Sequence, residues 1–172
     1  YKTFNSGTAS EVRALRGLSL KLDPADFIVI LGGNGSGKST LLNAVAGNFM
    51  VDEGCIELAG KNITRWEDFK RAQLIGRVFQ NPFLGTAAKM SIAENFAIAA
   101  SRGARRGLRW ALGRRFLDDL RERVAGLRMG LESRIDTPMG ALSGGQRQAL
   151  TLLMATWHTP SLLLLDEHTA AL

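Results

Sequence analysis

The pattern of apolar and polar positions predicts strands near the start of the chain, followed by a glycine-rich turn and a helix. Residues 18–22 alternate between apolar and polar side chains, as a half-buried strand does. Residues 27–31 form a continuous apolar, β-prone run, which favours a strand buried on both faces. Residues 39–47 carry apolar side chains at helical spacing and end on Gly47, which suits a helix C-cap. The pattern therefore places a strand and a helix on either side of the glycine-rich turn.

The rest of the chain alternates short elements with longer helical stretches. The pattern predicts a strand at 54–58, a turn at 59–62, a short helix at 68–73 and a strand at 74–79 that is interrupted by Gly76. It then predicts a helical region at 91–130 that is broken by glycines, a helix at 143–156 and a buried strand at 162–165. The order predicts a mixed β and α/β core with a helical insertion between Gln80 and Ser143.

The glycine-rich turn matches the phosphate-binding loop pattern at every fixed position. Its glycines let successive N–H groups curl around an anion, and the start of the following helix adds partial positive charge. We expect Lys38 to reach the β- and γ-phosphates of ATP, and Ser39 to offer its hydroxyl to Mg²⁺. A chance glycine-rich turn is the alternative, and the flanking strand and helix disfavour it. The candidate nucleotide-binding residues here are Gly32, Gly33, Asn34, Gly35, Ser36, Gly37, Lys38, Ser39 and Thr40.

Two acidic residues follow the four leucines at 162–165. An apolar strand that ends in acids presents them at its carboxyl end, where ligands bind in open α/β sheets. We expect Asp166 to hold Mg²⁺ and Glu167 to orient and polarise the attacking water. A strand that simply ends in a solvated acidic pair is the alternative.

A third motif, Leu-Ser-Gly-Gly-Gln at residues 142–146, resembles the signature of ATP-binding cassette (ABC) proteins. Ser143 and two glycines at a helix start supply a hydroxyl and free N–H groups, which suit a phosphate. The resemblance implies that Ser143, Gly144, Gly145 and Gln146 cover the nucleotide of a second copy in a head-to-tail dimer.

The resemblance extends to two further positions and meets one departure. Gln80 resembles the family's Q-loop glutamine, which implies contact with Mg²⁺ and the attacking water. Phe4 lies where the family has an aromatic that stacks on adenine, with an ordinary strand aromatic as the alternative. His168 stands where the family more often has proline, and it lies too close to Glu167 to be the switch histidine.

The resemblance implies an α/β P-loop NTPase fold (RecA-like core), with an N-terminal antiparallel β-subdomain and a helical signature subdomain. We expect residues 1–80 and 157–172 to form the nucleotide-binding core and about 81–142 the inserted subdomain. The chain starts at Tyr1 and lacks the D-loop aspartate and the switch histidine. We therefore expect a fragment truncated at both ends, whose hydrolysis is impaired.

Composition narrows the choice of partners. A net charge of +6 suits nucleotide, nucleic acid or lipid headgroups. Arginines are dense from residue 102 to 115, and we expect Arg114 and Arg115 to pair with Asp118 and Asp119 on a solvated helix. Contact of residues 102–109 with lipid headgroups or with a cytoplasmic loop of the partner is the alternative. The single cysteine, Cys55, excludes an internal disulfide or a cysteine-based metal site.

Three hypotheses about function remain open. The first is an ATP-hydrolysing subunit on the cytoplasmic face of the cell membrane, peripheral to separate transmembrane permease subunits, working as a dimer and served by a substrate-binding protein. The second is a soluble cassette ATPase that acts on nucleic acid or ribosomes. It is disfavoured because the helical insertion lacks the sustained heptads of a coiled coil. Trp110 is also the only aromatic residue among the arginines, so no platform for stacking bases is evident. The third is a cassette that binds ATP without turning it over, against which Glu167 argues.

Overall fold

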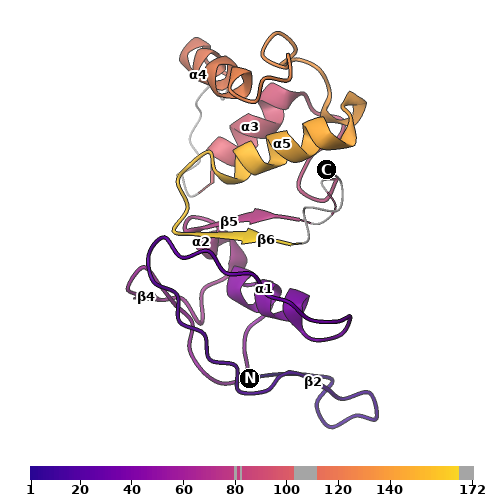
Figure 1. Ribbon diagram of the computed structural model, residues 1–172, viewed down its shortest axis with the longest axis vertical. Coiled ribbons are helices and arrows are strands. Elements are labelled where there is room, and N and C mark those ends of the chain that lie inside the picture. Colours follow the sequence, from indigo (N-terminus) through magenta and orange to yellow (C-terminus); the bar gives the residue numbers. More distant parts are fainter. Residues whose placement is uncertain (80, 82, 103–111, 167–172) are drawn as a thin grey trace. The chain divides into compact units, whose positions relative to one another are not determined.

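The computed structural model describes residues 1–79, 81, 83–102 and 112–166, and it divides into two compact units. The first unit, Tyr1–Arg71, contains β1 (Lys2–Phe4), β2 (Val12–Leu15), α1 (Lys38–Ala46), β3 (Glu57–Leu58), β4 (Lys61–Asn62) and α2 (Asp68–Arg71) (Figure 1). The second unit, Ala72–Leu172, contains β5 (Ile75–Val78), α3 (Ile92–Ala100), α4 (Arg114–Ala125), the 3-10 helix η1 (Met139–Ala141), α5 (Gly144–Ala155) and β6 (Leu162–Leu165). The predicted division into a nucleotide-binding core, residues 1–80 and 157–172, and an inserted helical subdomain, about 81–142, stays a prediction.

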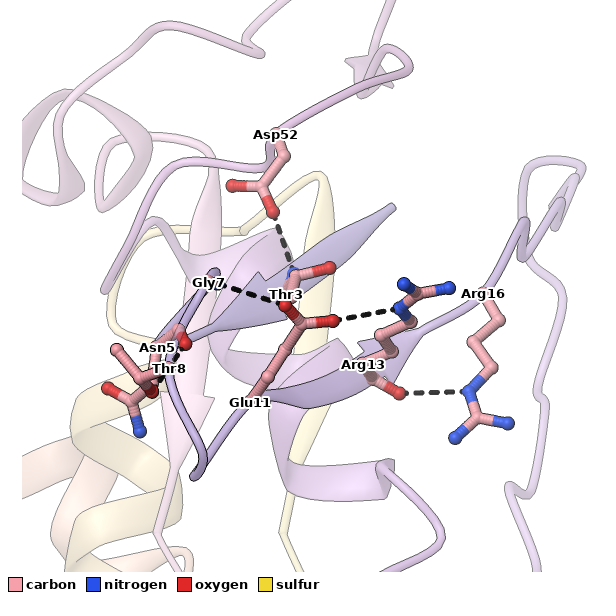
Figure 2. Close-up of polar contacts among 8 residues, drawn as sticks. All are labelled: Thr3, Asn5, Gly7, Thr8, Glu11, Arg13, Arg16 and Asp52. Carbon is pink, nitrogen blue, oxygen red and sulfur yellow. Dashed lines mark hydrogen bonds and ion pairs between the residues drawn. The ribbon is translucent and has the colours of Figure 1, made fainter.

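An antiparallel hairpin of β1 and β2 opens the first unit, and carboxylates hold its loop and its first strand (Figure 2). Glu11 accepts hydrogen bonds from the backbone N–H of Gly7 and from Nε of Arg13, each at 3.0 Å. The Gly7 N–H, and after it Arg13, lowers the pKa of Glu11, because both donors favour the ionised carboxylate. Asp52 accepts a bond of 2.7 Å from the N–H of Thr3. The hairpin is therefore tied down by charge-assisted hydrogen bonds.

The second hairpin joins β3 to β4 through a two-residue turn. Ala59 and Gly60 both have positive φ, at 50° and 72°, as a type I′ turn requires. The predicted strand at 54–58 is confirmed only at Glu57–Leu58, and Lys61–Asn62 belongs to a strand rather than to the turn.

Helix α1 confirms the helix predicted after the glycine-rich turn. Gly47 is its C-cap in the left-handed conformation, φ 90°, and its N–H donates to the carbonyl oxygen of Asn43 at 3.0 Å. The short helix predicted at 68–73 is α2, which ends two residues earlier, at Arg71.

The two strands predicted before α1 are wrong for this structure. Neither residues 18–22 nor residues 27–31 belong to a strand, and Phe27 and Leu31 are 84% and 86% exposed. A strand is held by the backbone groups of a partner strand. In the described part of the chain, no backbone hydrogen bond links either run to another segment. Apolar patterning indicated a tendency to be buried, but pairing decides whether a strand forms.

In the second unit, β5 and β6 pair in parallel, with Ile75 opposite Leu162 and Val78 opposite Leu165. The predicted strand of leucines is confirmed, although only Leu164 is buried. Gly76 lies within β5 and does not interrupt it, contrary to the prediction. A Cβ on Gly76 would lie 2.6 Å from the carbonyl oxygen of Ala155, so glycine is there to let α5 approach the strand.

Helices α3, α4 and α5 lie on one side of this strand pair (Figure 1). Helix α5 contacts β5, α3 contacts α5, and α4 contacts α3. Their shared core includes Phe96, Leu120 and Leu150, all fully buried, and Trp157 packs edge-on against Phe96 at 5.4 Å between ring centroids. No helix within the described ranges is long and apolar enough to cross a membrane.

The acidic residues of α4 pair with arginines other than those expected. Asp118 pairs with Arg121 at 3.2 Å, and Asp119 pairs with Arg123 at 3.0 Å. The predicted partners precede the acids in the chain. An acid that precedes its basic partner suits the helix dipole better, which explains why Asp118 and Asp119 pair with the arginines that follow them. Arginines 105, 106 and 109 of the cluster lie outside the described residues.

Candidate functional site

The glycine-rich loop of the first unit bends through two glycines in the left-handed region. Gly35 has φ 78° and Gly37 has φ 91°, and the N–H of Ser36 donates to the carbonyl oxygen of Gly33 at 3.2 Å. A Cβ on Gly37 would lie 3.0 Å from the carbonyl oxygen of Ala14, so β2 also passes close to the loop. Larger residues at 35 and 37 would strain the bend.

Lys38 lies back over this loop. Its Nζ donates to the carbonyl oxygens of Gly32 and Gly33 at 2.6 and 3.0 Å, and the side chain is half-buried. An ammonium carries three donors, so one remains for a third acceptor. The loop therefore presents a cation held at a fixed place, with a donor to spare for an anionic ligand.

The N-terminus of α1 is open to an anion. Gly37 supplies no capping side chain, and the first turn contains no acidic residue. Ser39 is exposed and Thr40 half-buried in that turn. Uncapped N–H groups and the positive end of the helix dipole both favour a phosphate at this position.

Arg71 secures the other end of α1. Its side chain is fully buried, and Nη1 donates to the carbonyl oxygens of Ala44 and Val45 at 2.7 and 2.9 Å. Nη2 and Nε donate to the carbonyl oxygens of Thr64 and Trp66, each at 2.9 Å. Burial lowers the pKa of Arg71. A cation at the helix C-terminus complements the dipole, and it anchors the helix that carries the loop.

Phe4 lies half-buried in β1 of the same unit. Its ring meets Phe49 edge-on, with centroids 5.2 Å apart and an interplanar angle of 81°. The ammonium of Lys2 lies 5.4 and 5.5 Å from the two ring centroids and forms an ion pair with Asp52 at 2.7 Å. These contacts orient the Phe4 ring, and its stacking on adenine stays a prediction.

The acidic end of β6 belongs to the second unit. The N–H of Asp166 donates to the carbonyl oxygen of Val78 at 3.1 Å, which continues the pairing of β6 with β5. Its carboxylate lies 3.9 Å from the guanidinium of Arg77, and the two side chains are 20% and 13% exposed. Burial lowers the pKa of Arg77, and the charge of Asp166 offsets part of that effect. Gln80 and Glu167 lie outside the described residues.

The signature motif starts α5 with a reciprocal cap. The hydroxyl of Ser143 accepts from the N–H of Gln146 at 3.2 Å, and Oε1 of Gln146 accepts from the N–H of Ser143 at 3.1 Å. A Cβ on Gly144 or on Gly145 would meet no atom within 4 Å. Packing within this chain does not require either glycine, so they leave the helix start open to a group from outside.

The first unit thus contains residues 32–40, and the second contains Asp166 and residues 143–146. The hydroxyl of Ser39 and the carboxylate of Asp166 are oxygen donors, which fit a hard cation such as Mg²⁺. Within the described residues, no three His, Cys, Asp or Glu side chains gather into a metal site. A cation held at either residue would therefore take further ligands, such as phosphate oxygens.

Sequence reasoning did not single out Arg71, Arg77 or Arg147 as supports of these motifs. Each arginine is buried or nearly so and bonds to main-chain carbonyls or stacks on an aromatic ring. No local pattern marks the contacts of Arg71 and Arg147, because the carbonyl of Ala44 and the ring of Phe83 come from other parts of the chain. Arg77 stacks on Phe79, two residues further along the chain.

Comparison with known proteins finds one family model that covers the glycine-rich loop, the signature motif and Asp166. Residues 15–170 match the family model described as ABC transporter. The chain is 41% identical over 155 residues to the tyrosine transport ATP-binding protein of Clostridioides difficile (strain R20291), covering 90% of this chain and 61% of that protein. It is 36% identical to the macrolide export ATP-binding/permease protein MacB of Syntrophobacter fumaroxidans (strain DSM 10017 / MPOB), covering 99% and 23%. The chain therefore spans less than two thirds of these two relatives.

Solved structures agree with this match. The dimeric ATP-binding cassette MJ0796 in a post-hydrolysis state, bound to ADP and Pi, is 26% identical with a TM-score of 0.81, covering 99% of this chain and 72% of that one. The protein cbiO1 from Clostridium perfringens, part of the ABC transporter complex cbiONQ, is 29% identical with a TM-score of 0.71, covering 99% of this chain and 64% of that one. These likenesses confirm the predicted fold class, an α/β P-loop NTPase. The described part of the chain contains two small antiparallel sheets and one parallel strand pair.

Proposed function

The chain belongs to the ABC transporter family, and from that premise we propose that it binds and hydrolyses ATP to power a membrane transporter. The observation that carries the proposal is Lys38, which lies over the loop carbonyls at the uncapped start of α1. A fixed ammonium beside open N–H groups is the arrangement that holds the phosphates of a nucleoside triphosphate.

In this proposal, residues 32–40 bind the phosphates, and Phe4 stacks on adenine. Ser39, Gln80 and Asp166 would hold Mg²⁺ together with the phosphate oxygens. Bound Mg²⁺ would neutralise the charge of the β- and γ-phosphates.

In the hydrolysis step, Glu167, the acid that follows Asp166, acts on the attacking water. Glu167 orients that water and takes its proton while the water oxygen bonds to the γ-phosphorus. The bond from the γ-phosphorus to the bridging oxygen breaks, which leaves ADP and inorganic phosphate. Lys38 holds the γ-phosphate in place as negative charge moves toward the leaving ADP oxygen.

The signature residues complete the site of a second copy. Ser143 and Gly145 are exposed or half-exposed at the start of α5, and a Cβ on Gly145 would meet no atom of its own chain. A phosphate bound to the loop of a partner cassette fits this opening. The dimeric state of the cassette MJ0796 supports a dimer, and we propose that its two copies pair head to tail.

The partners we propose are transmembrane permease subunits, which place the chain at the cytoplasmic face of a membrane. The likeness to a tyrosine transport ATP-binding protein favours an amino acid as the solute. We propose import, with a substrate-binding protein as a further partner. The lipoprotein-releasing ATP-binding protein LolD 1 of Caulobacter vibrioides, 34% identical, makes release of a lipid-linked cargo the competing assignment. Uptake of labelled amino acids in cells lacking the gene would distinguish the two.

Two variants of the full-length protein test the proposed ATPase. Glu167→Gln is expected to bind ATP but to stop at an ATP-bound dimer, visible by size-exclusion chromatography. Ser143→Arg is expected to retain ATP binding by the single chain while losing turnover, because the new side chain fills the opening at α5. Turnover at the parent rate in Glu167→Gln would remove Glu167 as the base, and unchanged turnover in Ser143→Arg would exclude the shared site.

A further inference from the structure

The segment that follows Gln80 in the sequence is joined by backbone hydrogen bonds to the segment that precedes the signature motif. Backbone N–H groups of Gly140 and Met139 donate to the carbonyl oxygens of Ala88 and Met90 at 2.8 and 2.9 Å. Just beyond, Ser91 and Pro138 form an antiparallel bridge. We call residues 83–91 the exit segment and residues 137–142 the entry segment. The two segments lie side by side, so a displacement of one displaces the other.

Arg147, one turn into α5, contacts both segments. Its guanidinium lies 3.9 Å from the centroid of the Phe83 ring, in the exit segment. Its Nη2 donates to the carbonyl oxygens of Gly140 and Leu142 at 3.1 and 3.4 Å, in the entry segment. Leu142 immediately precedes Ser143, and Phe83 follows Gln80 by three positions. One side chain therefore links the neighbourhoods of two predicted site residues.

The rest of the exit segment is held by a different side chain. Asn95 is 2% exposed, and its amide accepts from the N–H of Ala87 at 2.8 Å and donates to the carbonyl oxygen of Ala87 at 3.1 Å. It also donates to the carbonyl oxygens of Met90 and Ser91. Asn95 thus fixes the turn before α3, whereas Arg147 holds the Phe83 end.

Arg147 is a poor choice for stability alone. The side chain is 2% exposed, yet its Nε and Nη1 have no hydrogen-bond partner within the described residues. Buried donors without a partner are costly, and an apolar side chain of similar volume is often as stable as a buried charge or more so. The planar cation is therefore better explained by the geometry that it imposes on Phe83 and on the carbonyls before Ser143.

We propose that Arg147 is a positioning residue that locks the segment after Gln80 to the start of the signature helix. The inference rests on the proposed ATPase function. In it, Gln80 contacts the water and Mg²⁺ of its own site, while Ser143 reaches the nucleotide of the partner copy. Arg147 keeps Phe83 against the carbonyls that precede Ser143, so a movement of the exit segment is passed to the start of the signature helix when ATP is bound.

The test is a double-mutant cycle in the full-length protein, with Arg147→Met, Phe83→Leu and the double variant. Phe83 is 58% exposed, so its replacement leaves the fold intact. Each single variant is expected to bind a fluorescent ATP analogue as the parent does and to keep its melting temperature. Each is expected to lose about tenfold in kcat. The double variant is expected to lose no more than either single variant, because the two residues act as a unit.

Two further variants serve as controls. Arg147→Lys keeps the charge but not the planar stacking surface, so it is expected to behave like Arg147→Met in kcat. Arg102→Met removes another partly buried arginine that donates to α5, through the carbonyl oxygen of Met154 at the far end of the helix. It is expected to retain parental turnover.

The outcomes separate this inference from the proposed function. A parent protein that neither binds nor hydrolyses ATP would end the proposed function itself. A parent that hydrolyses ATP, with parental kcat in Arg147→Met and Phe83→Leu, would overturn only the role of Arg147. Independent, multiplying losses in the double variant, or a loss explained by a lowered melting temperature, would overturn it as well.

Discussion

Replacing Arg71 with methionine tests how the helix behind the phosphate-binding loop is held. The guanidinium donates four hydrogen bonds to main-chain carbonyls, two of them at the C-terminal end of α1. Methionine fills a similar space without any donor. The change therefore removes the bonds and the charge while leaving little cavity.

The magnitude follows from which carbonyls water can reach. The bonds to Ala44 and Thr64 are buried, so their oxygens would be left without partners, at about 1–3 kcal/mol each. The bonds to Val45 and Trp66 are only partly buried, so water can replace the guanidinium there. The guanidinium's own burial penalty is relieved in the variant, which offsets part of the loss. We expect a net loss of about 3 kcal/mol in the free energy of unfolding.

The assay is thermal and urea unfolding of Arg71→Met, alongside binding of a fluorescent ATP analogue. A loss of about 3 kcal/mol lowers the melting temperature of a chain of this size by roughly 6–12 °C. ATP binding should weaken too, because the loop is anchored through α1. Arg65→Met removes an exposed arginine of the same segment and should change neither quantity. Unfolding free energy within 1 kcal/mol of the parent would refute the anchoring role of Arg71.

Three further variants test other contacts. Gly76→Ala should destabilise the fold by roughly 1–3 kcal/mol in urea unfolding, because its Cβ would lie 2.6 Å from the carbonyl oxygen of Ala155. Lys38→Met should leave the melting temperature almost unchanged and abolish ATP binding measured by calorimetry, since it removes the ammonium above the loop. Gly145→Ala should raise stability by about 0.5–1 kcal/mol, because its Cβ meets open space in a helix, yet lower ATP turnover by occupying the opening.

The helices were the elements that sequence reasoning predicted best. Helices α1 and α5 were predicted to within one or two residues, because Gly47 and Ser143 are local start and stop signals. A helix makes its hydrogen bonds within one segment, so apolar spacing and caps are enough to place it. The glycines of the loop are likewise a local signal, because Gly35 and Gly37 adopt positive φ.

Strands were predicted less well, for the opposite reason. Residues 27–31 have the composition of a buried strand but make no strand pairing in the described chain, whereas residues 75–78 form β5 through a glycine that had indicated a break. Both results depend on what lies beside the segment. The carbonyl oxygen of Ala155 explains Gly76, and it comes from a helix far along the chain.

The sequence by itself identified the motifs of this protein: a lysine in a glycine-rich loop, acids after a run of leucines, and a serine with two glycines at a predicted helix start. These motifs are local, and local order is enough to recognise them. Only the tertiary structure decided what supports them. Arg71 lies at the end of α1, and Arg147 lies between Phe83 and the approach to Ser143. The carbonyl of Ala44 beside Arg71 and the ring of Phe83 beside Arg147 come from other parts of the chain, so these contacts appear only once the chain has folded.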